Sequence, residues 1–122
     1  MNIEWVRRYC MAMPHATEQV QWGHDLVFKV GGKMFAAGPL EGPFDVCLSF
    51  KAGPEEFAEL CERPGIIPAP YMARAQWVAL EDWDARPAAE LKRLLKQSYD
   101  LVFARLPKKT QVALAVRRRA AP

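Results

Sequence analysis

Apolar residues recur three or four positions apart in three stretches of the chain, which is the spacing of one helix face. Residues 3–13 form the first stretch, and a proline follows them at position 14. Residues 54–61 open with proline and two glutamates, which favour the first turn of a helix. Residues 88–106 carry the longest leucine stripe and end at Pro107. The pattern therefore predicts three helices.

Alternating apolar and polar residues predict strands at residues 20–30, 33–37, 46–51 and 76–80. The first stretch is interrupted at Gly23-His24-Asp25, so it predicts two strands. Gly31-Gly32 predicts a two-residue hairpin turn, because glycine takes the positive φ that such turns need. Pro68 and Pro70 lack backbone donors, and residues 66–72 are therefore predicted to form an ordered loop across the core.

The predicted order is a helix, four antiparallel strands, a short helix, a loop, a strand and a long helix. Helices packed on one face of an antiparallel sheet bury all of these apolar stripes, so the expected fold class is α+β. A chain of 122 residues is the size of a single domain. We expect one domain over residues 1–122, in which about 110–122 form a partly frayed basic C-terminal tail.

Composition agrees with a globular protein, since 51% of the residues are hydrophobic and 25% are charged. No apolar run approaches the roughly 18 residues of a membrane span, and residues 1–13 contain Glu4 and two arginines where a signal peptide is apolar. We therefore expect a cytoplasmic protein without membrane contact. Cys10, Cys47 and Cys61 form no CxxC pair, which favours reduced, buried thiols over a disulfide or a zinc site.

Catalytic patterns are missing from the sequence. His15 and His24 are the two histidines, neither at a metal-ligand spacing, and no nucleophile motif or phosphate-binding glycine loop is present. The sequence therefore predicts neither an enzyme nor a cofactor or metal site. Glu81, Asp82 and Asp84 follow a predicted strand and could form a carboxylate site, and the alternative is a solvated turn before a helix.

Positive charge is concentrated at the end of the chain. Residues 86–122 contain ten lysines and arginines against two acidic residues, a net charge of +8, whereas residues 1–85 carry −5. A cluster of lysines and arginines that neutralises phosphates releases counterions and binds nucleic acid without sequence preference. The four tryptophans could stack on bases, but in a small domain such rings more often fill the core.

Short motifs in order along nearly the whole chain resemble the MmcQ/YjbR family. They are Met13-Pro14-His15-Ala16, Trp22-Gly23-His24, Phe28 to Ala36, Pro64 to Met72, Trp77-Val78, Ser98 to Val102 and Leu106-Pro107-Lys108-Lys109. The resemblance implies a CyaY-like fold, which agrees with the predicted order of elements. It also implies DNA binding through two hairpins, the double-wing motif.

The Gly31-Gly32 hairpin suits such a wing because Lys29 and Lys33 lie close to its tip. The next turn carries Glu41 and Asp45, which would repel phosphate. We therefore expect double-stranded DNA to be contacted by lysines and arginines in the hairpin, the last long helix and the tail. The candidates are Lys29, Lys33, Lys92, Lys96, Lys108, Lys109, Arg117, Arg118 and Arg119.

Two alternatives remain beside DNA binding. The first is a protein-interaction or chaperone-like module, because CyaY-like folds resemble small secretion chaperones and an exposed sheet face suits a partner peptide. The second is the iron binding of frataxin-like proteins, which uses an acidic first helix. Here that helix has Glu4 against Arg7 and Arg8, which disfavours iron.

Overall fold

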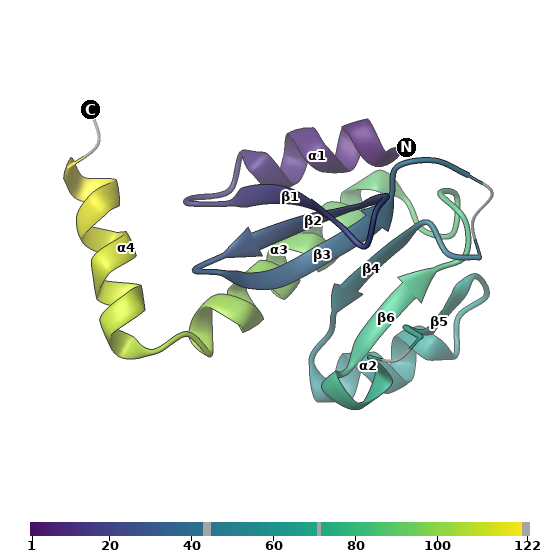
Figure 1. The fold of residues 1–122 in the computed structure, drawn as a ribbon. Helices are drawn as coiled ribbons and strands as arrows, with labels where there is room; N and C mark the ends of the chain where they lie inside the picture. The colour runs from purple at the N-terminus through teal and green to yellow at the C-terminus, as the bar shows by residue number, and fades with distance from the viewer. Residues whose placement is uncertain (43–44, 71, 121–122) are drawn as a thin grey trace.

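The computed structural model describes residues 1–42, 45–70 and 72–120, with side chains described as far as Ala115. In this part of the chain six strands form one antiparallel sheet in the order β1-β2-β3-β4-β6-β5 (Figure 1). The strands are β1 (Thr17–Gln21), β2 (Asp25–Val30), β3 (Lys33–Pro39), β4 (Leu48–Lys51), β5 (Ile66–Pro68) and β6 (Trp77–Leu80). The helices are α1 (Ile3–Met11), α2 (Pro54–Cys61), α3 (Ala88–Ala104) and α4 (Lys108–Ala120), with a 3-10 turn at Ala73–Ala75.

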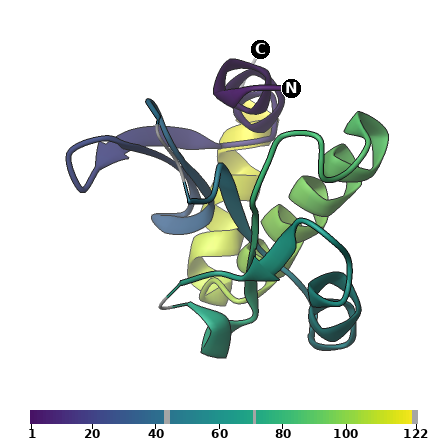
Figure 2. The same ribbon diagram turned by 90° about the vertical axis from the view of Figure 1, so that its right-hand side faces the viewer.

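One core joins the sheet to the first three helices. Phe28, Phe50 and Val78 point from three strands into a cluster with Leu91 and Leu95 of α3, and all five side chains are fully buried. In the view of Figure 2, α2 and α3 lie on the same side of the sheet. The α+β class with helices packed on one sheet face is therefore confirmed. We call the opposite side of the sheet the open face.

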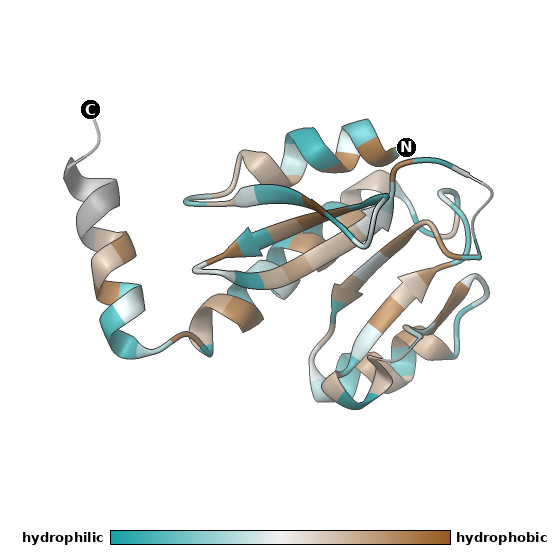
Figure 3. Cartoon of the chain, viewed as in Figure 1, coloured by the Kyte–Doolittle hydropathy of each residue, from teal (hydrophilic) through white to brown (hydrophobic). Residues whose placement is uncertain are grey.

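The open face has a smaller apolar cluster of its own. Trp77, Ala79 and Ala69 are buried there, and Met34 and Met72 pack partly buried against them. Hydrophobic and hydrophilic positions alternate along several strands (Figure 3). Because a strand sends successive side chains to opposite faces, the residues that line the open face come from alternate positions of β3, β4 and β6.

The junction between β3 and β4 is completed by a helix side chain. The two strands pair at Ala36–Phe50 and Ala37–Ser49 and then diverge. Beyond the last pair the Ser98 hydroxyl of α3 donates to the Phe35 carbonyl at 2.6 Å and accepts from the Lys51 amide at 2.9 Å. Ser98 is fully buried, and its hydroxyl replaces the strand-to-strand hydrogen bonds that the divergence removes.

Two predictions about local structure were wrong. Residues Ile66–Pro68 form the edge strand β5 rather than a loop, and Pro68 is tolerated because it stands at the end of a strand that has one neighbour. A fourth helix also follows Pro107 where no helix was predicted. The Pro107 carbonyl accepts from the Gln111 amide at 3.0 Å, so this proline begins α4 as well as ending α3. Fraying at the far end of α4 stays a prediction.

Candidate functional site

Part of the predicted cationic set gathers at one end of the sheet. Lys33 is exposed beside the tip of the β2–β3 hairpin, and Lys108 and Lys109 are exposed in the first turn of α4. Figure 3 shows that α4 begins with hydrophilic residues. None of the three lysines has an ion-pair partner within the residues that the structure describes.

A hollow of about 620 Å³ separates the hairpin tip from α4, and we call it the hairpin pocket. Both hairpin glycines and Lys109 line it, and Thr17 and Thr110 contribute hydroxyl groups. The Nε2 atom of His15, another lining residue, is buried and finds no hydrogen-bond partner in the described part of the chain. The described lining includes no carboxylate; its members are His15, Ala16, Thr17, Gly31, Gly32, Lys109, Thr110, Ala113 and Leu114.

Gly31 fixes how closely the hairpin approaches the connection between α3 and α4. Its φ is +58°, and a Cβ placed on it would lie 2.6 Å from the Leu106 Cδ1 atom. Gly32 also has positive φ, at +81°, but a Cβ there would meet nothing within 4 Å. The hairpin prediction is therefore confirmed, and Gly31 has a packing role in addition to its role in the turn.

Other predicted lysines are engaged elsewhere on the molecule. The Lys29 ammonium donates to the Gln19 side chain at 2.9 Å on the neighbouring strand. Lys92 lies about 6 Å from the centroids of two aromatic rings of α1. Lys96 forms an ion pair with Asp100, one turn along α3. The side chains of the tail arginines lie outside the described residues; these are Arg117, Arg118 and Arg119.

Several arginines serve as cross-links between elements. Arg63 follows α2 and Arg86 precedes α3, and both bind the Glu90 carboxylate. The hydrogen bond from Arg86, aided by both positive charges, holds the pKa of Glu90 below its ordinary value. The Arg7 guanidinium of α1 likewise bonds Glu18 of β1 at 2.8 Å and lowers the pKa of that carboxyl. These arginines stabilise the fold and are neutralised by acidic partners.

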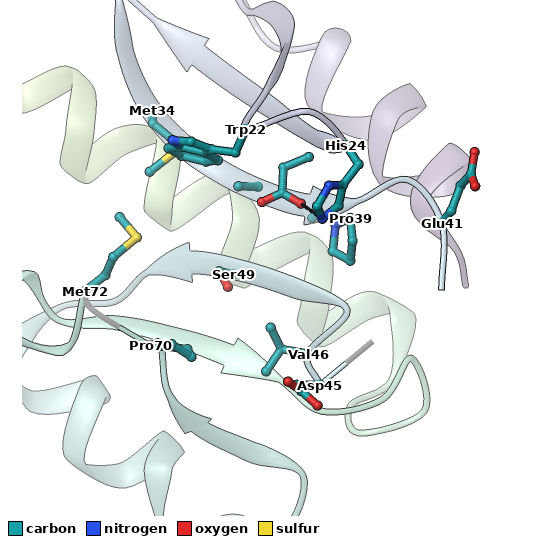
Figure 4. A pocket seen from close by; sticks show the side chains of 13 residues that line it. Trp22, His24, Met34, Pro39, Glu41, Asp45, Val46, Ser49, Pro70 and Met72 are labelled. Atoms are coloured by element: carbon teal, nitrogen blue, oxygen red, sulfur yellow. Dashed lines mark ion pairs between the residues drawn. The ribbon is translucent and has the colours of Figure 1, made fainter. Parts of the chain in front are cut away.

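A second hollow, of about 690 Å³, lies on the open face, and we call it the open-face groove (Figure 4). Its floor is made of small residues of β3 and β4, including Ala37 and Ser49. The β1–β2 turn forms one wall and the segment before β6 forms the other. The described lining comprises Trp22, His24, Asp25, Met34, Ala37, Gly38, Pro39, Glu41, Asp45, Val46, Ser49, Pro70 and Met72.

The charge of the open-face groove is opposite to that of the hairpin pocket. Asp25, Glu41 and Asp45 place three carboxylates on it, and the described lining contains neither lysine nor arginine. The His24 Nε2 atom lies 3.8 Å from the Asp25 Oδ1 atom. Glu41 and Asp45, predicted to disfavour phosphate, thus belong to this acidic groove at the far end of β3 from Lys33.

The remaining acidic cluster is a turn. Glu81, Asp82 and Asp84 are all exposed, and the Asp82 carboxylate accepts from the Asp84 amide at 2.7 Å. This arrangement supports the solvated turn over a carboxylate site. Within the described residues no group of three or more histidine, cysteine, aspartate or glutamate side chains is arranged to hold a metal ion. Among the described helices, none combines the length and apolar character that crossing a membrane requires.

The three cysteines are free thiols. Cys10 and Cys47 are buried, and desolvation raises the pKa of Cys10 to about 12 and that of Cys47 to about 11. Cys61 is half-buried, and burial raises its pKa as well. The predicted burial is confirmed for the first two thiols, whereas Cys61 retains partial exposure; the reduced state stays a prediction.

The sequence reasoning missed the groove and the junction residue Ser98. Trp22 was named in one of the motifs of the family resemblance, but the other walls come from segments far apart in the sequence. No sequence pattern indicates that these segments lie together on the open face. The hairpin pocket was partly foreseen, because the glycine pair and the lysines after Pro107 were both recognised.

These features define a class of small α+β proteins with helices on one face of an antiparallel sheet and an open opposite face. The YjbR family model matches residues 11–101, and the chain belongs to that family. No functionally curated protein matches the chain.

Two solved structures are similar in fold. A Deinococcus radiodurans protein with a DUF419 domain is 30% identical, with 93% of this chain and 88% of that chain covered and a TM-score of 0.82. A Pseudomonas syringae protein is 22% identical, with 84% of this chain and 99% of that chain covered and a TM-score of 0.68. The second likeness supports the fold alone.

Proposed function

We propose that this protein is a non-catalytic DNA-binding protein that contacts the phosphate backbone of a duplex through the hairpin pocket. The observation that supports the proposal is that Lys109 lines a hollow whose described lining has no carboxylate, while exposed Lys33 and Lys108 directly follow and precede the lining residues Gly32 and Lys109. The proposal rests on these three of the nine predicted cations, and the side chains of the tail arginines lie outside the described residues. Backbone amides of the glycine turn and two threonine hydroxyls would add neutral donors to phosphate oxygens.

The contact is one-sided rather than a double wing. The β2–β3 hairpin would approach the duplex, whereas Glu41 and Asp45 at the opposite end of β3 would repel it. Three lysines that each neutralise one phosphate give a slope of about −2.7 in log affinity against log salt. Affinity should then fall about 40-fold between 50 mM and 200 mM salt, on the same basis.

Fluorescence anisotropy with a labelled 20-base-pair duplex at these two salt concentrations tests the proposal. The double variant Lys108→Gln with Lys109→Gln should weaken binding and reduce the salt slope by about 2. The matched control is Lys92→Gln with Lys96→Gln, which removes the same charge from lysines engaged with α1 and Asp100. Absence of binding at 50 mM salt, or equal losses in the two variants, would refute the assignment.

The open-face groove favours a second function, that of a protein-interaction module. It combines apolar walls with three carboxylates on a face that the first three helices leave uncovered. Association through such a surface should persist in high salt and after nuclease treatment, because apolar contacts do not depend on counterion release.

A further inference from the structure

The open-face groove carries both apolar and acidic groups along its length. Met34 and Met72 lie toward one end, with Trp22 over Met34, and Val46 and Asp45 lie toward the other (Figure 4). A ligand that matches this arrangement has apolar groups along its length and a positive group where the carboxylates stand. Nucleic acid has the wrong charge for this groove.

The shape of the groove selects the kind of ligand. Its rim residues Trp22, Glu41, Asp45 and Pro70 are themselves exposed, so the groove can cover one side of an occupant without enclosing it. Small-molecule sites usually bury most of their ligand's surface. An extended polypeptide needs only one side covered, and methionine walls adapt to varied side chains.

Trp22 supports a binding role for this surface. It has φ +54° and precedes Gly23 at φ +87°, so the β1–β2 turn has positive φ at two successive residues. Turns of this kind favour asparagine followed by glycine, and a bulky residue at positive φ is strained. The indole is nevertheless held at the groove with 63% of the residue exposed. Neither turn formation nor core packing explains a tryptophan at this position.

We propose that the open-face groove binds an extended segment of a partner protein that carries arginine or lysine among apolar side chains. Cationic side chains of the segment lie against the separate carboxylates of Asp25, Glu41 and Asp45, and the apolar side chains contact Trp22 and the two methionines. The inference gives a ligand class to the interaction role named above, and it is independent of duplex binding by the hairpin pocket.

Titration of the ¹⁵N-labelled 122-residue chain with a seven-residue peptide of alternating arginine and leucine tests this inference by NMR. Amide shifts should concentrate at the groove. A peptide of alternating glutamate and leucine should produce weaker shifts there, because the carboxylates repel it. A dissociation constant of about 1 mM corresponds to a binding free energy of about −4 kcal/mol. The inference would be overturned if the basic peptide at about that concentration shifted no groove amides, or if the acidic peptide shifted them equally.

Two variants locate the interaction. Glu41→Gln with Asp45→Asn should weaken the basic peptide about three- to tenfold, as expected for two exposed charge contacts. Glu81→Gln with Asp84→Asn removes the same charge from an exposed turn outside the groove and should have little effect. Equal weakening in both would show general charge attraction and refute a specific groove.

Trp22→Asn separates binding from folding. Asparagine suits the positive φ of the turn, so thermal stability should be kept or raised while peptide affinity falls at least threefold. Unchanged peptide affinity in this variant would argue against the groove as the binding surface. Duplex affinity should stay unchanged in Trp22→Asn, whereas Lys108→Gln with Lys109→Gln should leave peptide binding intact. The two proposals can therefore fail separately.

Discussion

Ser98→Ala tests whether the α3 hydroxyl holds the two halves of the sheet together. The substitution removes one oxygen from a fully buried site and keeps helix propensity high. The Phe35 carbonyl loses its donor, and the Lys51 amide loses its acceptor. Both groups belong to strands that diverge at this point, so the strands cannot pair with each other to replace the lost bonds.

The expected destabilisation follows from these two groups. Leaving a buried donor or acceptor unsatisfied costs about 1–3 kcal/mol each, and the Lys51 amide is only partly buried. We therefore expect the free energy of unfolding to fall by about 2–4 kcal/mol. For 122 residues, the unfolding entropy corresponds to about 4 °C per kcal/mol, so Tm should fall by about 8–16 °C.

Differential scanning calorimetry measures this shift, and hydrogen exchange supplies a local readout. The Lys51 amide should exchange faster in the variant, because its acceptor is gone. Ser49→Ala is the control, since Ser49 is a half-buried serine of β4 whose hydroxyl makes no hydrogen bond to other described residues. A Tm within about 2 °C of the unmodified protein for Ser98→Ala, or equal shifts in both variants, would refute the reasoning.

Two further predictions concern the hairpin and the acid stability. Gly31→Ala should lower the free energy of unfolding by about 1–3 kcal/mol in chemical denaturation. This loss should exceed that of Gly32→Ala, because only a methyl group at position 31 would contact Leu106. Equal losses in the two variants would exclude the packing role of Gly31. Glu90→Gln should lower stability by about 1 kcal/mol at pH 7. Because the pKa of Glu90 is lowered in the folded state, the stability difference between the unmodified protein and this variant should be complete above the ordinary pKa of 4.5 and should vanish as pH falls through the lowered value. A stability difference that persists in acid would contradict the ion-pair assignment.

Local sequence signals predicted the elements whose cause is local. Gly31-Gly32 produced the expected hairpin, because glycine reaches the positive φ of the turn without help from distant residues. The leucine stripe of α3 was recognised for a similar reason, since helical spacing and burial coincide over many residues. The charge imbalance also pointed to the segment that contains Lys109, which lines the hairpin pocket.

Features that depend on distant partners could not be predicted in this way. Residues 66–68 form a strand because β6 offers a free edge, and two prolines nearby pointed instead to a loop. In the sequence Ser98 is an ordinary polar residue of a predicted helix, and its role depends on the divergence of β3 and β4 beside it. The lysines of α3 were predicted to face phosphate, but nearby rings and Asp100 engage them.

The attachment of α4 has a consequence for how the basic end of the molecule can respond to a ligand. Between residues 108 and 115, Leu114 is the one buried side chain, and the helix stands at the edge of the molecule (Figure 1). Local opening of a segment costs little when few apolar contacts hold it. We therefore expect α4 to separate from the core before the sheet and α3 unfold, held near Pro107 by the hydrogen bonds from Gln111 to the Ala104 and Leu106 carbonyls, so that Lys108 and Lys109 can adjust to an irregular surface.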